Sequence, residues 1–209
     1  MKPMIFSTPM VEALLNTKPG VWPAEPVDLK KPFKWQTRRV VKPQPVSLTP
    51  NDYSWRGDIQ GPKVLSINLL KHAPCETGDI LYVRERWSDF FMTGYIYRAG
   101  EECVSETFRW KPSIHMPRKA ARLFLEVKNV RIEKLREITP EDKINEGVTD
   151  CCRAYPCDID LMCDVPCFAK FWDSLNAKRG YGWGENPYVY VYEFMRLEPE
   201  EAQRKDAEI

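Results

Sequence analysis

One short segment carries side chains that could together attack an amide. Residues 34–39 read Lys-Trp-Gln-Thr-Arg-Arg. A threonine hydroxyl near a lysine amine is a nucleophile and base pair, provided that burial lowers the lysine pKa. In an extended segment, Gln36 and Arg38 face one way while Thr37 and Arg39 face the other. The spacing alone favours a plainer interpretation, a solvated basic strand edge.

A second candidate is Glu146, which stands immediately before Gly147, where a short helix should end. An acid at a helix C-terminus opposes the helix dipole. It therefore needs a reason to be there, and a cationic partner such as Lys34 would supply one. A surface glutamate without a role is the simpler alternative.

A third candidate is the loop that runs from Trp110 to Arg118 and contains His115. A rigid loop with a tryptophan, a histidine and an arginine could line a pocket for a nucleobase. The alternative is that Trp110 only packs and His115 faces solvent. Arg84 and Glu85, in a nearby strand, could form an internal ion pair, and such pairs are usually structural.

The cysteines suggest either a metal site or a reduced loop. Of seven cysteines, Cys151, Cys152, Cys157, Cys163 and Cys167 fall within one short stretch. The paired C-x2-C knuckles of a zinc ribbon are missing. Four thiolates could still surround one zinc ion, with Cys151, Cys157, Cys163 and Cys167 as its ligands. A reduced cysteine-rich loop is the favoured alternative, and no cofactor is required for the chemistry above.

The composition excludes several classes of protein. The chain has 209 residues, of which 43% are hydrophobic and 29% are charged, with a net charge of +1. This is an ordinary globular balance, and global charge argues for no polyanion, although local patches can bind one. Apolar runs are too short for a membrane span, and the N-terminus does not fit a signal peptide. We therefore expect a soluble cytoplasmic protein that makes no contact with a membrane.

Helices and strands are expected where caps and alternation indicate them. Thr8 should cap a helix that ends near residue 15, and Thr139-Pro140 should start a helix that stops at Gly147. A further helix is expected over residues 168–179. Strands are expected over residues 35–41, 80–87, 95–98, 122–135 and 188–194.

The pattern favours an α+β fold with a mainly antiparallel β-barrel, whose openings are covered by short helices. A single domain should span residues 1–197. It should carry a proline-rich insertion at 17–33 and a cysteine-rich insertion at 150–167. Residues 198–209 are polar and are expected to be a disordered tail.

Several motifs, taken in order, resemble the phage and prophage branch of the ASCH domain family, whose members are PUA-like β-barrels. The segments that carry the resemblance are FSTPMVEALLN, KWQTRRVVKP, GDILYVRERW, WKPSIHMPRKAARL, ITPEDKINEGV and FAKFWDSLNAKRGYGWGENPYVYVYEF.

The resemblance implies a relation to small bacterial amidohydrolases that act on N4-acetylcytidine. Their lysine, threonine, arginine and glutamate match Lys34, Thr37, Arg39 and Glu146 here. The catalytic set would then be Lys34, Thr37 and Glu146. The substrate would be bound by Ser7, Arg38, Arg39, Arg84, Trp110, His115 and Arg118.

Three hypotheses remain open at this point. In the first, Lys34 deprotonates Thr37 or a water, and Glu146 orients the lysine during hydrolysis of an N-acylated nucleobase or nucleoside. In the second, the same cleft binds RNA or another single-stranded nucleic acid without chemistry. A weaker third is a phage adaptor that binds a host protein through its cysteine-rich loop. The oligomeric state is not predicted.

Overall fold

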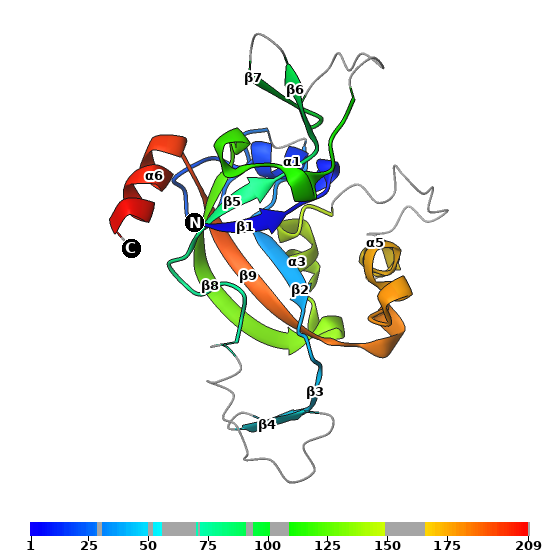
Figure 1. Cartoon of the computed structure of the whole chain (residues 1–209). Coiled ribbons are helices and arrows are strands. Elements are labelled where there is room, and N and C mark those ends of the chain that lie inside the picture. Colours follow the sequence, from blue (N-terminus) through cyan, green and yellow to red (C-terminus); the bar gives the residue numbers. More distant parts are fainter. Residues whose placement is uncertain are drawn as a thin grey trace. The chain divides into compact units, whose positions relative to one another are not determined.

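The structure is a computed structural model of the whole chain (Figure 1). The residues that it describes are 1–28, 31–49, 52–55, 70, 72–90, 94–100, 109–148 and 166–208.

The chain divides into two compact units, and each is described by itself. The first unit comprises Met1–Trp35, Thr77–Lys128 and Phe194–Ile209, and the second comprises Gln36–Glu76 and Asn129–Glu193. The expectation of one domain over residues 1–197 stays a prediction.

Each unit combines strands with short helices. The first unit contains β1 (Lys2–Ile5), α1 (Thr8–Leu15), β5 (Ile80–Arg84), β6 (Trp87–Phe90), β7 (Gly94–Tyr97), two 3-10 turns (Ser113–His115 and Arg118–Ala120) and α6 (Pro199–Glu208). The second contains β2 (Gln36–Val40), β3 (Pro45–Thr49), β4 (Asp52–Trp55), α3 (Pro140–Asn145), α5 (Pro166–Asn176) and three 3-10 turns (Leu135–Glu137, Ala177–Arg179 and Trp183–Glu185). Two long strands, β8 (Phe124–Lys134) and β9 (Tyr188–Leu197), have residues in both.

The main sheet is mixed, which confirms the α+β class. Its strand order is β1-β5-β8-β9-β2, and two smaller sheets pair β3 with β4 and β6 with β7. Strand β1 runs parallel to β5, whereas β5 with β8 and β2 with β9 are antiparallel. Within the described residues this order has two ends and does not close, so the PUA-like barrel is not confirmed and stays a prediction.

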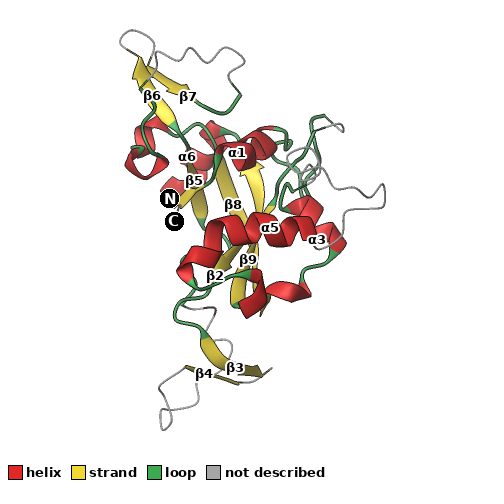
Figure 2. Cartoon of the chain, turned by 90° about the vertical axis from the view of Figure 1, so that its right-hand side faces the viewer, coloured by secondary structure: helices red, strands yellow, loops and turns green. Residues whose placement is uncertain are grey.

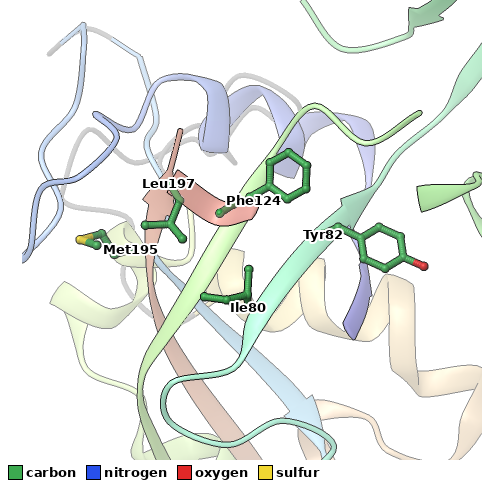
Figure 3. Close-up of a cluster of buried hydrophobic side chains, with 6 residues drawn as sticks. Ile80, Tyr82, Phe124, Met195 and Leu197 are labelled. Atoms are coloured by element: carbon green, nitrogen blue, oxygen red, sulfur yellow. The ribbon is translucent and has the colours of Figure 1, made fainter. Parts of the chain in front are cut away.

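The core of the first unit lies where β5, β8 and β9 come together. Figure 3 shows Ile80, Tyr82, Phe124, Met195 and Leu197 in this cluster, which also includes Ala202 of α6. Apolar side chains at alternate positions of a strand share one face. That spacing explains why residues 80 and 82, like 195 and 197, enter the same cluster.

The core of the second unit packs α5 against β9 (Figure 2). Phe168 and Trp172 of α5 contact Val189 and Val191 of β9, and Leu135 and Ile138 complete the cluster. The helical spacing of the two aromatic residues puts them on one face, as the sequence predicts. The turn at Ala177–Arg179 and the positive φ of Gly180 end this helical segment where expected.

Several expected elements are confirmed within a few residues, but two expectations were wrong. Helix α1 is present, yet its N-cap is Ser7 rather than Thr8. Residues 198–209 were expected to be disordered, whereas Pro199–Glu208 form α6. Ala202 of α6 is fully buried, and Lys205 donates to Glu126 Oε2 over 2.7 Å. One buried alanine and these charge contacts hold a segment whose composition is otherwise polar.

The expected proline-rich insertion is tied down by hydrogen bonds. The Asn16 side-chain amide donates to the carbonyl oxygens of Asp28, Lys31 and Pro32.

Among the described residues, no helix is both long and apolar enough to cross a membrane.

Candidate active site

Strand β2 presents its polar residues on two faces, as the sequence predicts. Its antiparallel register sets Arg38 opposite Val191 of β9 and Thr37 opposite Tyr192. Directly paired residues share a face of the sheet. Arg38 therefore lies on the face of the second unit's core, and Thr37 lies on the opposite face.

Arg38 is the centre of a buried ion cluster. Its guanidinium donates to Glu133 Oε1, to Asp142 Oδ2 over 2.7 Å and to Glu146 Oε1 over 3.1 Å. The side chain is 0% exposed. Burial lowers the pKa of Arg38, but the carboxylates of Glu146, Glu133 and Asp142 outweigh it and raise the pKa above its usual value. A guanidinium held in this way stays charged.

The short helix α3 supplies two of these carboxylates. Thr139 caps it by accepting from the Asp142 backbone N–H over 3.1 Å, and Asp142 closes the capping box. Asp142 and Glu146 are four residues apart, so they project from the same side of the helix. Glu146 is the C-cap residue and is 4% exposed. The helix-end glutamate thus has a cationic partner, as expected, and the partner that the structure describes is Arg38.

Arg131 of β8 extends the cluster toward solvent. It donates to Glu133 Oε2, to both carboxylate oxygens of Asp142 and to Glu193 Oε1, and its side chain is 32% exposed. Burial raises the pKa of Asp142, but the charges of Arg38 and Arg131 and a hydrogen bond from Gln36 hold it below its usual value. The residues Arg131, Glu133 and Asp142 were not among those predicted for the site. The signal that could have indicated Arg131 and Glu133 is the alternation of opposite charges at these two positions of the predicted strand.

The opposite face of β2 gathers a second set of residues around Thr37, which is 5% exposed. Burial lowers the pKa of Arg39, and the neighbouring Glu146 and Tyr192 offset part of that effect. Burial also raises the pKa of Tyr192 far above its usual value. Arg39 therefore lies within electrostatic range of both Glu146 and Tyr192.

Lys34 belongs to the first unit and is 1% exposed, so it does not stand in bulk solvent. Its backbone is held by Thr17, whose hydroxyl donates to the Lys34 carbonyl oxygen over 3.0 Å and accepts from the Lys34 N–H over 3.1 Å. Its ammonium lies 5.8 Å from the centre of the Phe6 ring. Convergence of Lys34 with Thr37 and Glu146 within hydrogen-bond reach stays a prediction.

The remaining expected binding residues lie in the first unit, and the contacts of Arg84, Trp110 and Arg118 are with other residues of that unit. Ser7 is exposed at the start of α1, and His115 is also exposed. Arg84 donates to Tyr82 Oη and to the Ile114 carbonyl oxygen. The Arg98 guanidinium lies 5.5 Å from the centre of the Trp110 ring. Arg118 forms an ion pair with Asp206, in which Nη2 lies 2.6 Å from Oδ2.

The expected Arg84–Glu85 ion pair is replaced by another. Glu85 is 1% exposed and accepts from Arg122 through both carboxylate oxygens, each over 2.9 Å. Arg84 is the last residue of β5, and Glu85 lies just after the strand.

The expected zinc ligands lie almost wholly outside the described residues. Cys151, Cys157 and Cys163 fall there, and of Cys167 only the backbone, in α5, is described. The zinc site stays a prediction that metal analysis of chelator-free protein would check. Less than about a tenth of an equivalent of zinc would mean that the loop is merely rich in cysteine.

Models of protein families give no match to the chain, and neither curated proteins nor solved structures give one. The resemblance to ASCH domains therefore rests on the sequence motifs, and what it implies is carried forward as a proposal.

Proposed function

We propose that the protein is an ASCH-type, PUA-like amidohydrolase that acts on an N-acylated nucleobase or nucleoside such as N4-acetylcytidine. The observation that carries the proposal is the burial of its three polar residues. Lys34, Thr37 and Glu146 are exposed by only 1%, 5% and 4%. Lysine and glutamate are almost never fully buried unless something compensates the loss of water. Their burial at the positions selected by the motif supports a chemical role.

In the proposed reaction, Thr37 Oγ1 attacks the acyl carbon and gives its proton to Lys34. The carbon–nitrogen bond then breaks, the nucleobase amine leaves with a proton, and water releases the acyl group as a carboxylic acid. The reaction requires Lys34 to be neutral for part of its cycle, which burial favours. Arg39, on the same face of β2 as Thr37, would stabilise the oxyanion.

The ion cluster gives Arg38 a role different from the expected one. Its guanidinium is 0% exposed and is held by three carboxylates. It cannot contact a substrate without giving up those partners. We therefore assign Arg38 to positioning Glu146 rather than to binding substrate.

The same observation weighs against the nucleic-acid-binding alternative. That hypothesis draws on the basic residues around Lys34, Arg38 and Arg39 as a surface for phosphate contacts. Two of these residues, Lys34 and Arg38, are only 1% and 4% exposed. A phosphate contact needs a basic side chain that reaches the surface.

Acetate release from N4-acetylcytidine and a panel of other N-acyl nucleosides tests the proposal. Wild-type protein should hydrolyse at least one of them, and Lys34→Met should lose activity by about 10³-fold or more while folding normally. Lys170→Met is the matched control, because Lys170 is exposed on α5. Full activity of Lys34→Met would remove the catalytic assignment. No turnover by wild type, together with salt-sensitive retention on single-stranded RNA, would replace the enzyme by the binder.

A further inference from the structure

The Tyr192 hydroxyl is a buried polar group that, within the described part of the chain, donates to no hydrogen-bond acceptor. The side chain is 0% exposed. Among the described residues, the hydroxyl has no hydrogen-bond partner of normal geometry. Leaving a buried hydroxyl unsatisfied is unfavourable compared with a phenylalanine ring of the same shape. Most such groups in native proteins are paired, so a buried hydroxyl that donates to no acceptor needs an explanation.

Tyr192 stands directly opposite Thr37. The two residues are Cα partners in the antiparallel pairing of β2 with β9, whose strands run side by side in Figure 1. Side chains of such a pair project from the same face, with their Cβ atoms about 5 Å apart. The phenol is longer than the threonine side chain. The phenol is therefore long enough to reach a group attached to Thr37 Oγ1.

The groups around Tyr192 keep it a donor. Burial raises the pKa of Tyr192, Cys75 and Tyr190 raise it further, and the Cys75 backbone and Arg39 offset only part of the shift. A backbone contact lowers the pKa of a phenol by donating toward its oxygen, which leaves the hydroxyl hydrogen to be given elsewhere. The phenol is neutral throughout the physiological pH range.

We propose that the Tyr192 hydroxyl donates a hydrogen bond to the acyl oxygen of the substrate as Thr37 attacks, and so is a further catalytic residue. The proposal rests on the proposed function, since it uses Thr37 as the nucleophile. The proton stays on Tyr192, and the negative charge that forms on the acyl oxygen is shared with it. The ligand that this arrangement selects is one whose carbonyl oxygen is on the carbon that Thr37 attacks, as in an N-acyl group.

Tyr192→Phe tests the proposal because it removes one hydroxyl and leaves the ring. With N4-acetylcytidine, or the best N-acyl nucleoside of the panel, kcat should fall about 100-fold with little change in KM. The midpoint of urea unfolding should fall little, because among the described residues the hydroxyl donates its hydrogen to no acceptor. Tyr188→Phe is the matched control: Tyr188 lies four residues before Tyr192 in β9 and therefore on the same face, and the Lys134 ammonium lies 4.1 Å from the centre of its ring. It should leave kcat unchanged.

The outcomes separate the two proposals. Turnover by wild type with an unchanged kcat for Tyr192→Phe overturns the role of Tyr192 and leaves the amidohydrolase standing. If wild type shows no turnover, calorimetric titration with N4-acetylcytidine decides. Binding that weakens tenfold or more in Tyr192→Phe, but not in Tyr188→Phe, supports the hydrogen bond while the hydrolytic function fails. Equal binding by the two variants, or no binding by wild type, overturns the proposed role of Tyr192.

Discussion

Arg38 Nη1 donates to Glu146 Oε1 over 3.1 Å, between side chains that are 0% and 5% exposed. The pair links strand β2, which carries Thr37, to the end of helix α3. Because Asp142 of the same helix also accepts from Arg38, the helix is held to the strand at two points one turn apart. A carboxylate fixed in this way keeps one orientation in the folded protein.

Removing the Arg38 guanidinium should strongly destabilise the protein. Arg38→Met leaves three carboxylates close together without their buried cation, and loss of one partner of a buried pair costs about 3–5 kcal/mol. Arg131→Met is the matched control, since Arg131 is 32% exposed and shares Glu133 and Asp142. Its loss should cost about 1 kcal/mol. Urea unfolding at neutral pH measures both, and equal losses would show that burial of Arg38 does not set the energy of the cluster.

Asp142 should make stability depend on pH in the acid range. Its pKa in the folded protein lies below the usual value, because the arginine charges outweigh burial. A carboxyl with a lowered folded pKa contributes stability above its unfolded pKa of about 3.9, and that stability is lost as pH falls through the folded pKa. Asp142→Asn should therefore be less stable than wild type at pH 7, and the difference should shrink as pH falls below about 4.

Urea unfolding from pH 7 down to the acid limit checks this dependence. Asp89→Asn provides a comparison, because Asp89 pairs with Lys111 at 2.7 Å but is 64% exposed. Its effect should be small at every pH. A gap between wild type and Asp142→Asn that stays constant with pH would contradict the prediction.

Thr37 should be required for its hydroxyl rather than its shape. Thr37→Val should lose about 10³-fold or more in kcat on an N-acyl nucleoside, whereas Thr37→Ser should stay within about tenfold of wild type. Circular dichroism should show the same fold for both variants. If Thr37→Val keeps its activity, the threonine is not the nucleophile and only holds a water or packs.

Helix α6 should be part of the folded protein. Ala202 is fully buried in the cluster with Ile80, Phe124 and Leu197. Ala202→Glu would bury an unpaired charge and should destabilise by about 3 kcal/mol or more. Gln203→Glu introduces the same side chain at the next, exposed position of the helix and should change stability by less than about 0.5 kcal/mol. Similar unfolding midpoints for the two variants would show that α6 does not pack.

The sequence by itself determined the elements whose signals are local. The capping box of Thr139 and Asp142 predicts the start of α3, and the alternation of Gln36, Thr37 and Arg38 predicts which side chains of β2 share a face. These features depend on hydrogen bonds and side-chain directions within a few residues, so they can be inferred without knowing the rest of the chain.

Only the tertiary structure decided which distant residues meet. Arg38 is a partner of Glu146 that the sequence did not predict, and it lies 108 positions away along the chain. Helix α6 folds because one alanine reaches a cluster built from β5, β8 and β9, although its own sequence is polar. The register of β2 on β9 brings Tyr192 opposite Thr37. The physical reason is that these pairings come from strand register and burial across the chain, and a shift of one residue would turn every side chain of the strand to the other face.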